Sequence, residues 1–415
     1  MLPVHYFLYE AAQKTPWSRC DRVWLEGRVV GRKHFLPYNQ PEVGDDEVRA
    51  VTEVLLSRWL TRGAVTQAFE AALAQYLGVP EVVAVSSATA ALHLALMSVG
   101  AGPGDEVITT PMTFAASVNA IIQTGAAPVL VDIDPDTGNI DLDAAERAIT
   151  ERTRAILPVH YGGCPVDIRR LNRLRDGRNV RIVEDAAHAL AARHDGALVG
   201  AHGNLTAFSF YATKNLTTGE GGALAVPTAD AAGAIRAMAL HGLSRHAWNR
   251  YQRGGSWEYD VIMLGYKYNM TDVQAAMGLA QLDKLSAMQQ KRAELADRYR
   301  TRLQGLPLRV PQEPDGVQHA WHLYSVHLDL DAIRGDRADV IEDLAKANIG
   351  TSVHFIPIYR HTFYREKFGW QNKDFPATEA FFAGQISLPL YPSMSTQDVD
   401  DVATALKDSL KRRWA

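Results

Sequence analysis

The sequence is poor in cysteine, with Cys20 and Cys164 as the two examples in 415 residues. Two cysteines cannot build a disulfide framework or a cysteine-based zinc site, and they fit a reducing cytoplasm. Long apolar runs are also missing, since none approaches the roughly 20 residues that span a bilayer. The N-terminus lacks the basic-then-apolar order of a signal peptide. We therefore expect a cytoplasmic protein without a membrane partner.

Charge of one sign is not in excess either. The 43 Lys and Arg residues nearly balance the 47 Asp and Glu residues, for a formal net charge of −4. This balance gives no electrostatic reason to expect a nucleic-acid partner. The histidines lack an HExxH motif or a paired-carboxylate context, so we expect no metal site. The length exceeds the roughly 250–300 residues at which single cores stop growing, which predicts more than one domain.

Short β-branched runs alternate with helical patterns between about residues 82 and 185. Strands are predicted at Val82–Val85, Glu106–Thr110, Pro128–Asp132, Ala155–Val159 and Val180–Glu184, and helices at Ala88–Val99, Ala115–Gln123, Leu142–Ile149 and Asp167–Leu174. Such alternation predicts an α/β fold with right-handed crossovers and a mostly parallel sheet covered on both faces. In these sheets, ligands bind beyond the carboxyl ends of the strands.

The pattern changes after about residue 284. A long charged helix over roughly Asp272–Gly305 leads to an α+β segment, with a strand at HAWHLYSVHLDL, a helix at Ala338–Ala347 and a final helix from Gln397. We therefore predict a large α/β domain at 37–284, a smaller C-terminal α+β domain at 285–415 and an N-terminal extension at 1–36. The first sixty residues are expected to lie over the small domain or a partner subunit.

The most informative residues lie between Glu184 and Leu224. Asp185 ends an apolar run, RIVED, so its carboxylate is expected at the carboxyl end of a strand, where ligands bind. Lys214 follows 29 residues later (214 − 185), after the apolar AFSF and before the glycine-rich TTGEGGAL. Upstream, VSSATAAL places Ala88 and Thr89 between a strand and a helix, where backbone N–H groups point at an anion.

Pyridoxal 5′-phosphate (PLP) chemistry requires a set of this kind. A lysine amine forms an imine with the cofactor aldehyde, and a carboxylate keeps the pyridine nitrogen protonated so that the ring accepts electrons. The phosphate needs hydroxyls and backbone N–H groups, for which Ser209 is a further candidate. Each piece alone is common, because lone lysines are usually solvated and strand-end aspartates usually cap helices. Their order and spacing together indicate PLP.

The sequence resembles the DegT/DnrJ/StrS sugar aminotransferases, which have the aspartate aminotransferase fold (PLP fold type I). The resemblance rests on EDAAHA at 184–189, FSF at 208–210, Lys214 and GEGG at 219–222. It extends from about Pro37 to the end of the chain and includes SRWLTRG, PVHYGGCPVD and GYKYNMTDVQAAMGLAQL. One departure is Ser87-Ala88-Thr89, where many members have S-G-T. The backbone N–H of the alanine stays free, so phosphate binding is expected to survive.

The resemblance implies a PLP-dependent transaminase that moves the amino group of L-glutamate onto a nucleotide-linked keto sugar. GYKYN, HAWNR and HAWHLY are similar to the branch that aminates C4 of UDP-linked 4-keto sugars, as in the synthesis of UDP-4-amino-4-deoxy-L-arabinose. Amination at C3 of a dTDP- or GDP-linked sugar, a cyclitol substrate, a non-aminating PLP enzyme and a non-catalytic scaffold remain alternatives. The family's C3 dehydratases replace the lysine with histidine, so Lys214 opposes that alternative.

The resemblance also assigns roles to individual residues and implies a homodimer with shared active sites. For the cofactor, it implies that Lys214 is the Schiff-base lysine and proton carrier, that Asp185 pairs with the pyridinium, and that the phosphate is bound by Ala88, Thr89 and Ser209. It further implies that Phe114 stacks on the ring and that His188 lies close to it. Asn269 and Arg250 are implied to reach the partner's site, and His354 and Tyr359 to face the sugar nucleotide. Without the resemblance, Phe114 is equally explained by core packing and Asn269 by a helix cap. A histidine such as His188 is more often a core residue, and an arginine in a polar loop, such as Arg250, is usually solvated.

Overall fold

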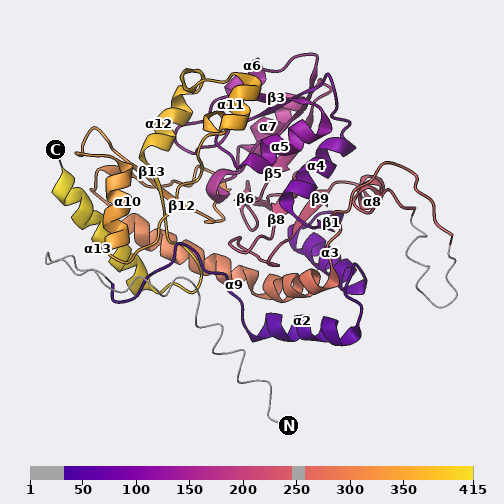
Figure 1. The fold of residues 1–415 in the computed structure, drawn as a ribbon, viewed down its shortest axis with the longest axis horizontal. Helices are drawn as coiled ribbons and strands as arrows, with labels where there is room; N and C mark the ends of the chain where they lie inside the picture. Colours follow the sequence, from indigo (N-terminus) through magenta and orange to yellow (C-terminus); the bar gives the residue numbers. More distant parts are fainter. Residues whose placement is uncertain (1–31, 245–257, 415) are drawn as a thin grey trace, which may run out of the picture.

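The structure, a computed structural model, describes residues 32–244 and 258–414. Its centre is a seven-stranded sheet of order β1-β9-β8-β5-β4-β2-β3 (Figure 1). The strands are β1 (Glu81–Val85), β2 (Glu106–Thr109), β3 (Ala127–Leu130), β4 (Thr153–Ile156), β5 (Arg181–Asp185), β8 (Leu205–Ser209) and β9 (Gly222–Val226). β9 runs antiparallel to both of its neighbours, whereas the pairs from β8 to β3 are parallel. The predicted α/β fold is confirmed.

Helices cover both faces of this sheet because its strands are apolar on both sides. In β1, Val83 and Val85 pack on one face with helices α4 (Ala88–Ser98), α5 (Ala115–Thr124) and α8 (Ala229–Met238). Val82 and Ala84 alternate with them and pack on the other face with α3 (Ala64–Leu77) and α9 (Asp272–Arg302). Helices α6 (Leu142–Arg147) and α7 (Ile168–Arg175) pack against β2, β4 and β5. The predicted strands and helices of this region are confirmed, with ends displaced by a few residues.

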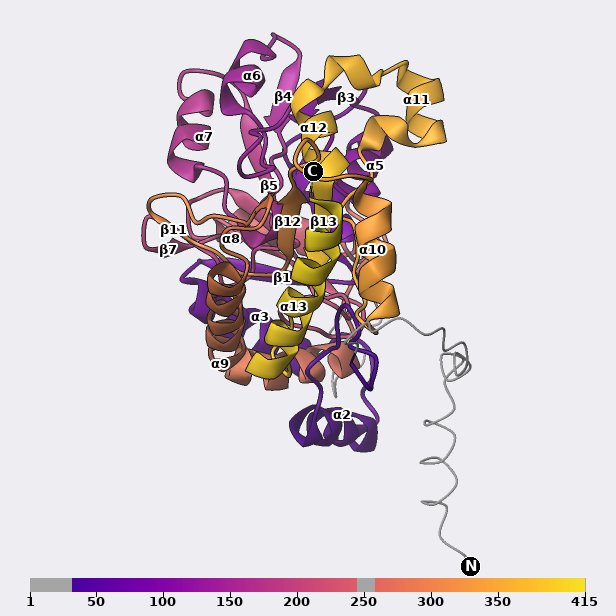
Figure 2. The ribbon, with the colours of Figure 1, turned by 90° about the vertical axis from the view of Figure 1, so that its left-hand side faces the viewer.

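The C-terminal part has its own antiparallel sheet, β10 (Leu308–Arg309), β12 (Tyr324–Leu328) and β13 (Gln385–Leu388), in the order β10-β12-β13. Helices α10 (Arg337–Lys346) and α13 (Thr396–Arg413) pack together beside it (Figure 2). The strand predicted over HAWHLYSVHLDL is shorter than expected. Trp321 has φ 48° and its N–H donates to His319 Nδ1, which is incompatible with an extended strand before Tyr324.

Smaller elements complete the described chain. They are α2 (Asp45–Ser57), α11 (Thr362–Phe368), α12 (Pro376–Gly384), three short 3₁₀ turns and the small sheet β11 (Val317–Gln318), β6 (Arg193–His194) and β7 (Ala197–Leu198). No helix in residues 32–244 and 258–414 is both long and apolar enough to cross a bilayer.

Helix α9 joins the two parts of the molecule. Its 31 residues begin at a capping box between Thr271 and Gln274 and run from α2 and α3 to α13 (Figure 1). The domain boundary predicted at residue 284 therefore falls inside a continuous helix, and the division into 37–284 and 285–415 stays a prediction. Residues 32–36 lie against the C-terminal part, where Leu36 bridges to Ile349; residues 1–31 are outside the described chain.

Candidate active site

The parallel topology brings the carboxyl ends of β1, β2, β5 and β8 to one edge of the sheet. The segments that leave these strands carry Ala88, Phe114, Asp185 and Lys214. Most of the residues predicted for the site are therefore gathered by the fold rather than by closeness in sequence. This edge is where open α/β sheets bind ligands.

The start of α4 forms an anion cradle. The side chain of Ser87 caps the helix by accepting from Ala90 N at 3.1 Å. Ala88 and Thr89 are the first two residues of the helix, so their N–H groups have no intrahelical acceptor and remain free for a ligand. A Cβ at Gly222 would lie 2.5 Å from Ala88 N, so a glycine is required where β9 passes this turn.

Ser209 lies next to the same cradle. It ends β8 and pairs with Gly222 across the β8–β9 ladder, and Gly222 contacts the backbone at Ala88. The Ser209 hydroxyl also accepts from Tyr211 N at 3.4 Å. The structure thus brings together the three predicted phosphate ligands, Ala88, Thr89 and Ser209.

Asp185 is buried at the end of β5. Its Oδ2 accepts from Ser117 Oγ at 2.7 Å and its Oδ1 from Ala187 N at 3.1 Å. Burial raises the pKa of this carboxyl above its ordinary value, while these two hydrogen bonds and the charge of Lys214 act in the opposite direction. The protein does not fully compensate the charge of this buried carboxylate. The carboxylate is therefore suited to pair with a cationic ligand group such as a pyridinium.

Lys214 lies in a tight turn after β8, where its N–H donates to Tyr211 O at 2.9 Å. Burial lowers the pKa of its amine to about 8, although the charge of Asp185 acts in the opposite direction. An amine with this pKa has a larger unprotonated fraction at neutral pH than an ordinary lysine. It is therefore better prepared to attack a carbonyl carbon.

Two histidines line the site beside Lys214. His188 accepts from Gly162 N through Nδ1 at 3.3 Å, and its ring centroid lies 4.4 Å from that of His322 and 5.7 Å from the ring of Phe355. Burial, together with the charge of Lys214, lowers the pKa of both histidines well below the ordinary value. Both rings are consequently neutral at neutral pH.

His354 joins this group, whereas Tyr359 does not. His354 Nδ1 lies 2.9 Å from Ser387 Oγ, and burial and the charge of Lys214 lower its pKa to about 4. Tyr359 is 1% exposed and donates to Glu379 Oε1 at 2.6 Å. The structure therefore does not bring Tyr359 together with the other candidates, and its placement gives no support to a substrate-binding role.

Phe114 stands at the N-cap of α5 and is 64% exposed. Its ring centroid lies 5.9 Å from that of Phe355. The core-packing alternative for Phe114 is therefore wrong in the isolated chain, and the exposed ring is available for stacking on a ligand.

Asn269 lies on the segment that leads into α9. It forms an isolated bridge with Val85, directly before the anion cradle, and its Nδ2 donates to Met270 O at 3.2 Å. The N-cap of α9 is Thr271, whose Oγ1 accepts from Gln274 N. The helix-cap alternative for Asn269 is wrong. Arg250 falls within residues 245–257, outside the described residues.

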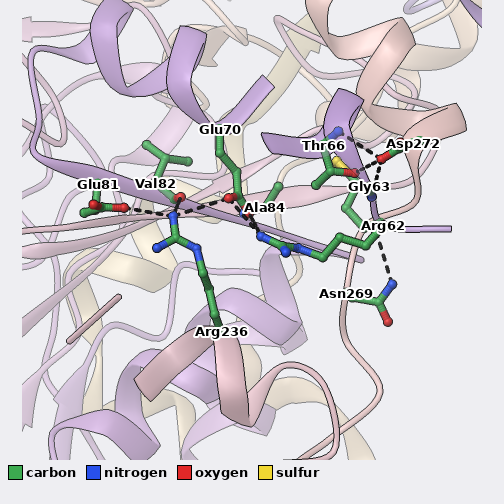
Figure 3. A network of polar contacts seen from close by, with 11 residues as sticks. Arg62, Gly63, Thr66, Glu70, Glu81, Val82, Ala84, Arg236, Asn269 and Asp272 are labelled. Atoms are coloured by element: carbon green, nitrogen blue, oxygen red, sulfur yellow. Dashed lines mark hydrogen bonds and ion pairs between the residues drawn. The ribbon is translucent and has the colours of Figure 1, made fainter. Parts of the chain in front are cut away.

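A polar network holds this segment in place (Figure 3). Asp272 Oδ1 accepts from Gly63 N at 2.7 Å and from Thr66 Oγ1 at 2.6 Å, which ties the start of α9 to the start of α3. Glu70 of α3 accepts from Arg236 at 3.3 Å and from Ala84 N at 3.0 Å. These bonds fix the chain at Asn269 relative to β1.

The residues present fit PLP. A free helix N-terminus suits the phosphate, a buried carboxylate suits the pyridine nitrogen, and an amine of lowered pKa suits the aldehyde. Ser117 and His322 were not among the residues predicted for the site, although Ser117 lies in the predicted helix Ala115–Gln123 and His322 in HAWHLY. In residues 32–244 and 258–414, no group of three or more His, Cys, Asp or Glu side chains is arranged to hold a metal ion.

Comparison with known proteins gives similarities over nearly the whole chain. Residues 41–407 match the profile of the DegT/DnrJ/EryC1/StrS aminotransferase family. The spore coat polysaccharide biosynthesis protein SpsC of Bacillus subtilis is 48% identical over 385 residues, which are 92% of this chain and 99% of SpsC.

Solved structures are also similar to this chain over most of its length. Spr1654 from Streptococcus pneumoniae, in its PMP (pyridoxamine phosphate) form, is 35% identical with a TM-score of 0.86, covering 91% of this chain and 99% of that one; a PLP form of it is also known. PseC of Helicobacter pylori, an aminotransferase involved in the biosynthesis of pseudoaminic acid, is 30% identical with a TM-score of 0.84, covering 92% of this chain and 100% of PseC.

Proposed function

Because the chain belongs to the DegT/DnrJ/EryC1/StrS family and is a PLP-dependent sugar aminotransferase, we propose that it moves the amino group of L-glutamate onto C4 of a nucleotide-linked 4-keto sugar. The products are a 4-amino sugar and 2-oxoglutarate. The reducing cytoplasm is the compartment proposed from its low cysteine content.

One observation carries this proposal: an amine, a carboxylate and an anion cradle converge at a single sheet edge. The pKa of Lys214 is lowered to about 8, and Asp185 is buried beside it. The free N–H groups at Ala88 and Thr89 stand at the end of β1, three strands away from β5 in the sheet. This is the arrangement needed to hold a phosphorylated pyridine aldehyde at both of its ends.

PLP, when bound, supplies an aldehyde and an electron-accepting ring. The protein's residues then divide the remaining work. The Lys214 amine would take the proton from the α-carbon of the donor as general base and, as general acid, deliver it to the carbon of PLP that carries the aldehyde. Asp185 keeps the ring nitrogen protonated. Ala88, Thr89 and Ser209 hold the phosphate, while Phe114 and His188 are proposed to enclose the ring and exclude water.

The sugar nucleotide is proposed from the relatives and from sequence similarity. SpsC is named for polysaccharide biosynthesis and PseC for the biosynthesis of pseudoaminic acid, which supports an amino sugar destined for a glycan. GYKYN and HAWHLY are similar to the branch that aminates C4 of UDP-linked sugars. His354, whose pKa is lowered to about 4 by burial and by the charge of Lys214, is proposed to contact the sugar.

The experiment is a donor and acceptor panel with the purified protein and PLP. L-Glutamate with a UDP-linked 4-keto sugar is expected to give 2-oxoglutarate and a product whose mass and NMR spectrum show an amine at C4. L-Aspartate and L-alanine serve as alternative donors, and 3-keto sugars as alternative acceptors. Amination at C3 alone, or no consumption of glutamate, would contradict the proposal.

We further propose a homodimer whose subunits share their active sites, with Asn269 and Arg250 reaching the partner. Large apolar side chains are exposed on the chain before Asn269, among them Ile262 and Leu264, and also on α2, where Leu56 is 76% exposed. Each of these two segments exposes several large apolar side chains, and such exposure favours a protein interface. Asn269 is anchored next to β1 by the contacts described above.

Mixing two impaired variants tests the shared sites. Asn269→Ala is expected to lower activity by roughly tenfold or more, the value of a hydrogen bond to a charged group. A heterodimer of Lys214→Ala with Asn269→Ala has one whole site, so its activity is expected to recover to about half that of the wild type. The measurement is the turnover of heterodimers purified with two different affinity tags.

The matched control carries the same two substitutions on one chain. A heterodimer of the wild-type chain with the Lys214→Ala/Asn269→Ala chain has no whole site when sites are shared, so it is expected to show no recovery. If each subunit works alone, the result is reversed: this control is half active and the mixed variants are not.

A further inference from the structure

Two buried hydroxyl groups lead to Asp185 from the beginning of α5. Ser117 Oγ lies 2.7 Å from Asp185 Oδ2, and Thr113 Oγ1 lies 2.7 Å from Ser117 Oγ. Ser117 is 0% and Thr113 1% exposed. An ionised carboxylate only accepts hydrogen bonds, so Ser117 donates to Asp185, and its oxygen is left to accept from Thr113. The pair is therefore a directed chain that ends on the carboxylate.

We infer that Ser117 is a positioning residue for PLP: it holds the Asp185 carboxylate ionised and in one orientation, ready to pair with the pyridine nitrogen, and Thr113 orients the Ser117 hydroxyl. This inference rests on the proposed function, since Asp185 must be the partner of the ring nitrogen. Ala187 N donates to the other oxygen, Oδ1, at 3.1 Å. Each oxygen thus has one acceptor direction occupied by protein and one left for a ligand.

The electrostatic surroundings of Asp185 show why this hydroxyl matters. Burial raises the pKa of the carboxyl, and four features lower it: the bonds from Ser117 and Ala187 and the charges of Lys214 and His160. The bond from Ala187 comes from the backbone and is independent of any side chain. Ser117 is therefore the one neutral side chain among these four features, and its hydroxyl stabilises the ionised carboxylate without carrying a charge of its own.

The same turn of chain also carries Phe114. Ser117 is the third residue of α5, whose N-cap is Phe114, and the positive end of the helix dipole faces the carboxylate that Ser117 holds. A single turn thus presents an exposed ring and a buried hydroxyl three residues apart. This links the orientation of Asp185 to the position of the proposed stacking ring.

The test is the dissociation constant of PLP measured by its absorption at a series of pH values. Ser117→Ala is expected to weaken PLP binding roughly tenfold or more, the value of a hydrogen bond to a charged group. Without the bond, the ionised form of Asp185 is less favoured and its pKa rises. The loss of PLP affinity on acidification is therefore expected at a higher pH than in the wild type.

Three variants keep the inference falsifiable. Ser117→Thr retains the hydroxyl and is expected to restore the wild-type profile. Ser409→Ala removes a hydroxyl that is as buried as that of Ser117 and that donates to the partly buried Asp343 Oδ2 at 2.7 Å in the C-terminal part. It is expected to leave PLP binding unchanged. Thr113→Val leaves Ser117 in place and therefore tests the inference even if Ser117→Ala does not fold. It is expected to weaken PLP binding in the same direction as Ser117→Ala, by a smaller factor.

The outcomes are distinct. Wild-type protein that binds no PLP would contradict the proposed function itself. Wild-type protein that binds PLP, with Ser117→Ala and Thr113→Val retaining the same affinity and pH dependence, would overturn the role of Ser117 alone. An equal shift in Ser409→Ala would also overturn it, because a general loss of stability would then explain the effect.

Discussion

Lys214→Ala is expected to lower the rate of transamination on the order of 10⁴-fold, because one side chain provides both the covalent attachment of PLP and the proton transfer. The variant is also expected to lose its PLP on dialysis, since the bond to the aldehyde is gone. The measurement is the formation of 2-oxoglutarate from L-glutamate with saturating PLP and acceptor sugar.

Two further variants make this result specific. Lys214→Arg keeps the positive charge without a nucleophilic amine and is expected to be as inactive as Lys214→Ala. Lys373→Ala removes an exposed lysine and is expected to behave as the wild type. A Lys214→Ala protein that retains more than a few per cent of the activity would remove Lys214 from the chemistry.

Asp185→Asn is expected to have opposite effects on activity and on the stability of the PLP-free protein. Turnover should fall on the order of 10²–10³-fold, the usual cost of removing a preorganised electrostatic group. Burial raises the pKa of Asp185 in the folded state, so stability falls as pH rises through that pKa. Above it, the asparagine removes an unfavourable buried charge, and the PLP-free variant should melt at the same or a higher temperature than the wild type.

Adding PLP is expected to reverse this order of melting temperatures. In the wild type, the pyridinium compensates the carboxylate, so PLP should raise the melting temperature more than it does in Asp185→Asn. Asp336→Asn is a suitable control, because Asp336 caps α10 and asparagine is an equally good cap. Equal stabilisation of Asp185→Asn and wild type by PLP would contradict the pairing of Asp185 with the ring.

The sheet and the convergence of its carboxyl ends were predictable from the sequence for physical reasons. Buried parallel strands leave continuous apolar runs, and the connection rules then place Asp185, Lys214 and the start of α4 at one edge. The sequence pattern around each of these residues is local, and the topology of the sheet then brings the residues to the same edge.

Residues whose positions depend on tertiary contacts were not predictable in this way. Tyr359 is turned toward Glu379, twenty residues along the chain, and no local pattern reveals that pairing. Asn269 and Thr271 are both acceptable helix caps by composition, and the capping box with Gln274 decides between them. Ser117 looks like an ordinary helix residue until the fold brings it to Asp185, 68 residues away.

The visible absorption spectrum of the purified wild-type protein, recorded before and after the addition of L-glutamate, shows at once whether the protein carries PLP and takes its amino group from glutamate. We expect a yellow protein whose long-wavelength band disappears with glutamate as the amino group passes to the cofactor and 2-oxoglutarate is released. A protein that stays colourless after incubation with PLP, or a yellow band that glutamate leaves unchanged, would contradict this expectation.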